Sequence, residues 1–214
     1  MLWLNVGAGR FPEENFVNID NSVFLFLVSY YKRFKWIFPK KFNSNFDDYW
    51  IPITNKNKYI RHNCTKPLPF LNNSVNHILC SHFIEHVYPS EAEKILHDFH
   101  NKLVKGGSLH IIVPDLNFLA KDYLDSNNEN AASEFMSLAM QKPLEKPSLL
   151  YRLLDSTGAF GLEHRWMYDI KNLTNLLINL NFKIVDKLDN LPSQKHYDTY
   201  KNEVGNLQIF AIKN

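Results

Sequence analysis

Two glycines and one aspartate have the types and spacing of a site for a nucleoside ligand. Gly7 and Gly9 follow the short apolar run Leu2–Val6, and Asp20 ends the next apolar run. Glycine lets the backbone adopt positive φ and approach a ligand closely. A carboxylate at the end of a strand can accept hydrogen bonds from both hydroxyls of a ribose. A plain turn at the glycines and a helix cap at Asp20 are the alternatives, but the combination favours a ligand site.

The residues that follow Gly9 disfavour a nicotinamide dinucleotide. The fingerprint for such cofactors has a third glycine three residues after the second, where a helix begins. Phe11 and Pro12 lie in that stretch here, and no third glycine follows.

Three residues after the expected fourth strand match the zinc-protease pattern H-x-x-E-H, namely His82, Glu85 and His86. Two histidines four residues apart on a helix can ligate zinc, with the glutamate as a base. The pattern directly follows a strand, however, and no third-ligand motif is evident. The alternative is that His86 caps or packs while Glu85 pairs with a base. We therefore expect no metal site and keep a zinc hydrolase as an alternative function.

A second segment offers a general base. His164 lies between Gly161 and Trp166, in a stretch that mixes polar and aromatic residues. Histidine titrates near neutral pH, so it suits proton removal from a hydroxyl or amine acceptor. The segment is either the edge of an acceptor pocket or a junction between loop and helix. We predict that His164 or His86 is the catalytic base.

Composition indicates an ordinary globular protein and excludes several classes. The 214 residues include 24 Lys+Arg and 22 Asp+Glu, for a net charge of +2, and 45% are hydrophobic. With only two cysteines, Cys64 and Cys80, a disulfide scaffold and a four-cysteine zinc site are excluded. A net charge near zero makes nucleic acid an unexpected partner. We find no leader and no membrane-spanning run, so we expect a cytoplasmic protein.

The hydrophobic pattern predicts strands that alternate with helices. Short apolar runs bounded by turn residues are typical of buried strands, and apolar residues at helical spacing indicate amphipathic helices. The expected strands are Leu2–Val6, Phe16–Asp20, Tyr59–Asn63, Val75–Ser81, Ser108–Val113, Phe182–Leu188 and Leu207–Ile212. The expected helices are Pro89–Val104, Leu116–Leu124, Ala131–Met140 and Ile170–Leu180. This alternation implies a mostly parallel sheet that is covered on both faces.

Turn residues set the expected boundaries. Ser90 is the predicted cap of the helix that begins near Pro89, and Gly106-Gly107 should end that helix. Residues 190–205 are polar and should form a loop.

The carboxyl ends of the expected strands should meet. Right-handed crossovers place these ends along one edge of a parallel sheet, which is where ligands of such folds bind. Five separate segments would gather there: Gly7–Gly9, Asp20, Asn63, Ser81–His82 and Pro114–Asp115. This convergence is the main functional inference from the residues.

Several motifs together resemble the class I S-adenosylmethionine-dependent methyltransferases. They are Leu4–Gly9 with Asp20, Leu68–Phe70, Ser74–Asn76, Ser81–His86, Leu103–Gly107 and Val113–Asp115. The resemblance covers about residues 1–125, with a further match from Gly161 to Phe182. More narrowly, the chain resembles the small methyltransferase-like proteins found among bacterial surface-polysaccharide genes. It implies one domain over residues 1–214 with an α/β, Rossmann-like, doubly wound and mostly parallel seven-stranded sheet whose last strand is antiparallel.

The resemblance also implies which residues hold S-adenosylmethionine. The implied contacts are Gly7 and Gly9 under the methionine and ribose, Asp20 at the ribose, Asn63 and Cys64 at the adenine, and Ser81 and His82 at the methionine end. Three asparagines depart from the family pattern, because Asn5, Asn63 and Asn76 stand where acids are common.

Residues from about 22 to 61 form an aromatic and basic insertion. Between residues 32 and 61 eight Lys/Arg face two Asp, so this part carries +6 and the rest of the chain −4. Aromatic side chains beside cations suit a sugar nucleotide or a lipid-linked sugar, and a basic aromatic helix can also lie on a membrane surface. The insertion is thus a predicted lid over the acceptor or a peripheral membrane contact, with simple packing as the alternative.

The sequence therefore predicts a methyltransferase that uses S-adenosylmethionine on a small molecule, a glycan or a sugar nucleotide. The alternatives are a non-catalytic cofactor- or sugar-binding module of the same fold, which the three asparagines motivate, and the zinc hydrolase. The oligomeric state is not predicted.

Overall fold

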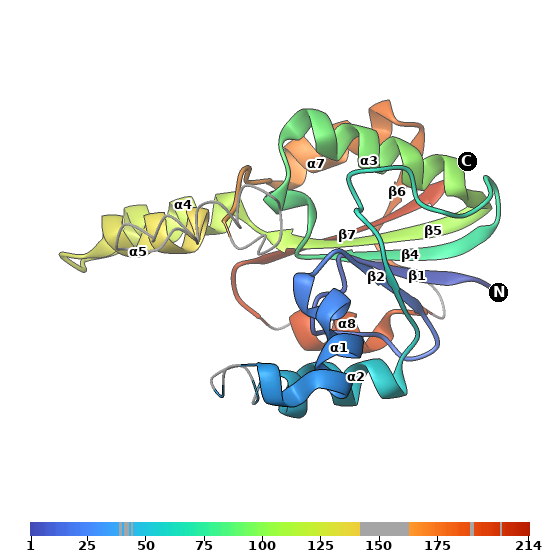
Figure 1. Ribbon diagram of the computed structural model, residues 1–214. Coiled ribbons are helices and arrows are strands. Elements are labelled where there is room, and N and C mark those ends of the chain that lie inside the picture. Colours follow the sequence, from blue (N-terminus) through green and yellow to red (C-terminus); the bar gives the residue numbers. More distant parts are fainter. Residues whose placement is uncertain (39, 41–42, 44, 142–162, 189–190, 202) are drawn as a thin grey trace.

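The computed structural model describes residues 1–38, 40, 43, 45–141, 163–188, 191–201 and 203–214, which include a seven-stranded sheet (Figure 1). The strands are β1 (Trp3–Val6), β2 (Val17–Asp20), β3 (Tyr59–Arg61), β4 (Val75–Ser81), β5 (Leu103–Pro114), β6 (Phe182–Val185) and β7 (Asn206–Lys213). Their order in the sheet is β3-β2-β1-β4-β5-β7-β6. The first five strands pair in parallel, and β7 is antiparallel to both β5 and β6. The predicted fold class is confirmed.

Helices cover both faces of the sheet (Figure 1). One layer contains α3 (Pro89–Lys102) and α7 (Ile170–Asn179), and the other contains α1 (Val23–Phe34), α2 (Ile51–Lys56) and α8 (Gln194–Tyr200). The hairpin of α4 (Leu116–Asp125) and α5 (Ala131–Met140) projects away from the sheet. Three short helical turns complete the described structure: η1 (Lys35–Ile37), η3 (Asn45–Trp50) and η4 (Ile84–His86). No helix among these is long and apolar enough to cross a bilayer.

Alternate residues of the central strands belong to different cores. In β4, Ile78 and Cys80 join the large core together with residues of α3 and α7, whereas Leu79 joins a small cluster with Phe16 and Ile112. Successive side chains of a strand point to opposite faces of a sheet, so this alternation shows that the two layers are packed separately.

A chain of buried hydrogen bonds lies between the sheet and α8. We name it the α8 network, and its members are His77, Ser108, His110, Ser193 and Gln208. Ser193 Oγ lies 3.1 Å from His77 Nε2 and 2.8 Å from His110 Nδ1. Ser108 Oγ is 2.7 Å from His77 Nδ1, and Gln208 Oε1 is 2.9 Å from His110 Nε2. Every ring nitrogen of the two histidines therefore has a partner.

The helix α8 corrects one prediction, because residues 190–205 were expected to form a loop. Its buried side includes His196, and its last residue, Tyr200, packs against the cluster around Phe16 and Leu79. The connection from β1 to β2 contains no helix, so this face of the sheet is covered by a helix from the C-terminal part of the chain instead. The pattern of residues 194–200 alone is too short and polar to indicate this.

The boundaries of α3 also differ from the prediction. Its N-cap is Tyr88 rather than Ser90, with Pro89 in the first turn, and Glu91 accepts a hydrogen bond from the Tyr88 backbone N–H at 3.1 Å. The helix ends at Lys102, and Gly106-Gly107 lie within β5. Gly106 has φ +75°, so the glycine bends the strand instead of ending the helix. The expected strand Phe182–Leu188 is shorter as well and ends at Val185.

Part of the predicted insertion 22–61 forms a small core of its own. Tyr31 and Phe46 are buried and their rings stack with centroids 4.3 Å apart, while Trp50 stacks on Phe24. The last residues of the segment belong to the main sheet, because β3 pairs with β2. The insertion is thus the connection from β2 to β3.

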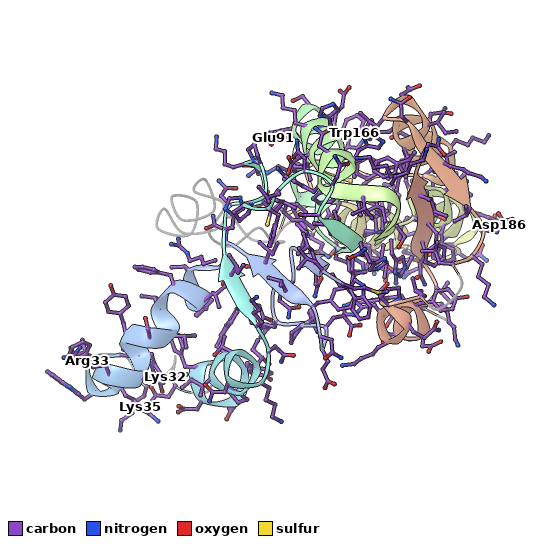
Figure 2. All side chains as sticks on the ribbon, turned by 90° about the vertical axis from the view of Figure 1, so that its right-hand side faces the viewer. Lys32, Arg33, Lys35, Glu91, Trp166 and Asp186 are labelled. Carbon is purple, nitrogen blue, oxygen red and sulfur yellow. The ribbon has the colours of Figure 1, made fainter. Side chains whose placement is uncertain are left out.

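The outer side of α1 carries a stripe of exposed aromatic residues. Phe26, Tyr30 and Phe34 are spaced by four residues and are 44%, 50% and 37% exposed. Lys32, Arg33 and Lys35 gather near the far end of the helix, as Figure 2 shows. The predicted roles of this segment, as a lid or as a membrane contact, stay predictions.

Candidate functional site

The turn after β1 has the backbone that its glycines predict. Gly7 and Gly9 have φ of +74° and +49°. A Cβ at Gly9 would meet nothing within 4 Å, so the space over this residue is open. A Cβ at Gly7 would lie 2.5 Å from the Cβ of Phe83, which follows β4. Gly7 is therefore needed for close packing against a side chain, and Gly9 is the glycine that a ligand can approach.

Asp20 lies beside this turn, at the end of β2. Its Oδ2 accepts a hydrogen bond from Gly9 N at 2.9 Å, and its Oδ1 accepts one from Ser22 N at 2.6 Å. Burial raises the pKa of the carboxyl, and the two backbone N–H groups oppose that rise. Each oxygen keeps a second acceptor site, because a carboxylate has about four in total. The two backbone bonds fix the orientation of the group.

The predicted adenine residues follow β3. Cys64 is buried close to the Gly7 N–H and to Asp20, and burial raises the pKa of its thiol to about 12. The sulfur is therefore a neutral packing group at neutral pH. Asn63 is exposed, and its Oδ1 accepts hydrogen bonds from Thr65 N and Thr65 Oγ1 at 3.0 and 2.9 Å. The structure thus brings Cys64 to the edge formed by Gly7 and Asp20.

The end of β4 places Ser81 and His82 at the same edge of the sheet. Tyr200 lies beside the Ser81 side chain, and the centroids of its ring and of the His82 ring are 5.1 Å apart. His82 has φ +50° and donates its backbone N–H to Ile112 O at 2.8 Å. We name the set formed by the glycine turn, Asp20, Cys64, Ser81 and His82 the cofactor edge.

Two of the three asparagines that depart from the family pattern have structural roles. Asn5 is 1% exposed, and its Nδ2 donates to Phe11 O and Asn18 Oδ1 at 3.0 and 2.9 Å. The Oδ1 of Asn76 accepts a hydrogen bond from Leu2 N at 2.8 Å. Asn5 acts as a donor, which a carboxylate cannot do, whereas Asn76 acts as an acceptor, as an aspartate also could.

A cleft of about 320 Å³ lies beside the cofactor edge. Its walls come from the loop after Gly9, from α2 and from α8, and they include Arg10, Lys195 and Tyr200. Tyr200 connects the cleft to the cofactor edge through its contacts with Ser81 and His82. Sequence reasoning missed Phe83 and Tyr200; the spacing of Tyr197 and Tyr200 within 194–200 was the only available signal for the latter.

The two predicted bases lie together behind β4. The rings of His86 and His164 have centroids 5.0 Å apart, and ligand atoms of Glu85, His86 and His164 all lie within 4.8 Å of one another. We name these three residues the Glu85 cluster. His164 is only 2% exposed, and burial lowers its pKa. The two histidines are thus neighbours, which the sequence analysis did not predict, and the role of either one as a base stays a prediction.

The helical premise of the H-x-x-E-H pattern is wrong. Only Ile84–His86 form a helical turn, η4, and it is a 3-10 turn. His82 precedes it with a left-handed backbone, so His82 and His86 do not share a helix face. The residue that joins Glu85 and His86 is His164, from a distant part of the sequence.

Comparisons with known proteins agree with the topology. No protein-family model and no curated protein sequence matches the chain. Among solved structures, a SAM-dependent methyltransferase from Methanosarcina mazei is 15% identical, with a TM-score of 0.54 over 99% of this chain and 91% of that one. One from Archaeoglobus fulgidus is 15% identical, with a TM-score of 0.53 over 99% and 85%. The fold is that of the class I methyltransferases.

A third similar structure is a possible histamine N-methyltransferase from Thermotoga maritima. It is 13% identical, with a TM-score of 0.52 over 100% of this chain and 82% of that one. In the methyltransferase fold the carboxyl ends of β1, β2 and β4 form one edge, and that is where this chain places Gly9, Asp20 and His82. Identities this low establish the fold alone, so function is argued from the residues.

Proposed function

We propose that this chain is an S-adenosylmethionine-dependent methyltransferase. The observation that carries the proposal is the bond from Gly9 N to Asp20 Oδ2, which holds the carboxylate next to open backbone. The ribose of an adenosyl group presents two adjacent hydroxyls, and an oriented carboxylate with free acceptor sites matches them. The residues present therefore fit the cofactor.

Other residues of the cofactor edge extend the proposed binding site. Cys64, kept neutral by burial, offers a small polarisable surface for the adenine ring. The side-chain NH2 of Asn63 can donate to a ring nitrogen of the adenine while its oxygen accepts from Thr65 in the turn. Ser81 and His82 would lie along the methionine part, with Tyr200 fixing both side chains from the cleft side.

When bound, S-adenosylmethionine supplies an electrophilic methyl group on a sulfonium. The chain then has mainly to bring an acceptor atom into line with that group and to exclude water, which is a matter of positioning. His82 is the histidine closest to the methionine end of the proposed site, and its side chain is 31% exposed. A base at His86 or His164 stays a prediction from the sequence.

We propose that the acceptor is a small molecule of the glycan or sugar-nucleotide class. The cleft beside the cofactor edge has aromatic walls and two cations, Arg10 and Lys195. Cations at such a position bind phosphate oxygens through charge-assisted hydrogen bonds, and aromatic rings pack on the apolar faces of sugars. The connection from β2 to β3 contributes α2 to this cleft, which supports the predicted role of the insertion at the acceptor.

The test is calorimetry with S-adenosylhomocysteine on the wild-type chain and on Asp20→Ala. Loss of a hydrogen bond to a charged group costs about 1–3 kcal/mol, so Asp20→Ala should weaken binding by about 5- to 150-fold. Asp125→Ala is the matched control, because Asp125 is exposed at the far end of α4. Equal affinity for the wild type and Asp20→Ala, or no binding by the wild type at millimolar ligand, would disprove the proposal.

The non-catalytic binding module remains the alternative, and turnover separates the two. Methyl transfer from labelled cofactor to a glycan or sugar nucleotide excludes the module. Cofactor binding without transfer to any member of a broad acceptor panel supports it.

A further inference from the structure

Next to His82 of the cofactor edge, a buried carboxylate has no hydrogen-bond partner among the described residues. Glu85 is 0% exposed, and within the described part of the chain neither of its carboxylate oxygens has a hydrogen-bond partner. His82 Nδ1 lies 3.3 Å from Oε1, but the geometry is not that of a hydrogen bond. An isolated buried carboxylate costs several kcal/mol unless a cation or hydrogen bonds compensate it. Something must therefore satisfy this group.

Two further buried polar atoms have no partner among the described residues, Nε2 of His164 and the hydroxyl of Tyr168, and both residues are 2% exposed. Isolated unpaired atoms occur in many structures, but Glu85 and His164 also offer ligand atoms within 4.8 Å of each other. Two neighbouring residues with unpaired atoms point to one ligand that binds both.

Both histidines of the Glu85 cluster are held in the form that binds a metal. His164 Nδ1 lies 2.9 Å from Ala139 O, and His86 Nδ1 lies 3.1 Å from Glu163 O. A carbonyl oxygen only accepts, so in each ring Nδ1 must carry the proton. The lone pair of each neutral ring is then on Nε2. Histidine ligands of metals typically donate their second N–H to a carbonyl or carboxylate in this way, which fixes tautomer and orientation.

We propose that Glu85, His86 and His164 bind a divalent transition-metal ion, for which Zn²⁺ is the best fit. Two imidazole nitrogens and one carboxylate form a known zinc ligand set with one coordination position open. Ligand atoms of the three residues already lie within 4.8 Å of one another, so small movements bring them to a common ion. Glu85 has two oxygens, so one can face His82 while the other binds the ion.

The proposed ion would join two distant segments. Arg165 N and Trp166 N already donate to Glu85 O at 2.7 and 3.1 Å, which holds the start of the described segment 163–188 against η4. The ion adds a bond between side chains to these backbone contacts. It would thus stabilise the region directly behind His82. This inference does not depend on methyl transfer and assigns no hydrolysis to the ion.

Metal binding and general-base action exclude each other at His164. Its Nδ1 donates to Ala139, so Nε2 is the only nitrogen that can accept a proton or bind an ion. The same holds for His86, whose Nδ1 lies against Glu163 O, so in this proposal both histidines are ligands and neither is the base that the sequence analysis predicted.

The first experiment uses the wild-type full-length chain, stripped with a chelator and titrated with Zn²⁺ alone and with Co²⁺ alone. We expect one equivalent of Zn²⁺ to bind with submicromolar affinity and to raise Tm. Co²⁺ at the same site should give visible d–d absorption bands of the intensity typical of four-coordinate nitrogen–oxygen ligation, and Zn²⁺ should displace it. Absence of the bands together with Zn²⁺ binding weaker than micromolar overturns the proposal.

The second experiment compares ligand variants with a matched histidine. Glu85→Gln, His86→Ala and His164→Ala should each weaken Zn²⁺ binding by at least about 100-fold, the upper range for loss of even an outer partner. His97→Ala should bind like the wild type, because His97 is exposed on α3. His86 is only partly buried, so its variant tests the site even where another fails to fold. Equal affinities in His86→Ala and His97→Ala overturn the proposal.

Discussion

The α8 network and the Glu85 cluster are both groups of buried polar side chains, on opposite sides of β4, and they differ in one respect. In the α8 network a single assignment of protons satisfies every member. Ser108 donates to His77, His77 to Ser193, Ser193 to His110, and His110 to Gln208. In the Glu85 cluster no such assignment exists among the described residues, because both Glu85 oxygens and His164 Nε2 stay unpaired. A complete network needs nothing further, whereas an incomplete one indicates a missing ligand.

The largest effect is expected from a substitution of Ser193, the central residue of the α8 network. In Ser193→Ala, His77 Nε2 and His110 Nδ1 both lose their partner inside the protein. Each unsatisfied buried group costs about 1–3 kcal/mol, so the free energy of unfolding should fall by about 3 kcal/mol. Urea denaturation measures this, with the exposed Ser133→Ala on α5 as the matched control. A loss below about 0.5 kcal/mol would show that the network is not essential for stability.

The second-largest effect is expected from acid, which should lower the stability that the α8 network provides. Burial is the main cause that lowers the pKa of His77 to about 3 and that of His110 to about 4. In the unfolded chain both titrate near 6.5, so below that pH the unfolded state binds more protons and stability falls as the pH falls. Between pH 7 and 5.5 the two histidines should together remove about 2 kcal/mol of stability.

Denaturation at several pH values tests this slope, and two variants locate it. His110→Asn should flatten the dependence, because one of the two groups no longer titrates. His97→Asn should keep it, since that residue is exposed on α3. A wild-type stability that is constant over this range contradicts the assignment of neutral, buried histidines.

The smallest effect is expected in the Glu85 cluster, where a substitution should raise the free energy of unfolding rather than lower it. In chelator-treated protein, Glu85→Gln replaces a buried carboxyl group that has no hydrogen-bond partner among the described residues, so the free energy of unfolding should rise by about 1 kcal/mol. Glu93→Gln, at an exposed position of α3, should change it by less than about 0.5 kcal/mol. With saturating Zn²⁺ the order should reverse, because only the wild type gains binding energy. A destabilised Glu85→Gln in metal-free protein would show that Glu85 has a partner without metal.

The cofactor edge could be predicted because its signals are local. Gly7, Gly9 and Asp20 follow strands directly, and parallel strands end at one edge whatever their helices do. The Glu85 cluster could be predicted only in part, since Glu85 and His86 are neighbours but nothing in the sequence indicates that His164 reaches them. Contacts between distant segments follow from tertiary packing. The spacing of hydrophobic residues in a single sequence predicts helices and strands, but it does not predict such contacts.

Phe83 and α8 were missed for related reasons. Phe83 approaches Gly7 because the backbone at His82 is left-handed, and no sequence pattern predicts a left-handed backbone at a histidine. Residues 194–200 are short and polar, and they are helical because Tyr200 and His196 pack on the sheet. Tertiary contacts thus overrode local propensity at both places.

The origin of α8 bears on how the chain is made. The small cluster of Phe16, Leu79 and Ile112 is assembled from the first 112 residues, yet Tyr200, which packs against it, lies 88 residues further along the chain. During synthesis on the ribosome this apolar patch stays open to solvent until residue 200 has emerged, a condition that favours association of unfinished chains. Emergence of α8 is accordingly the step that closes this face.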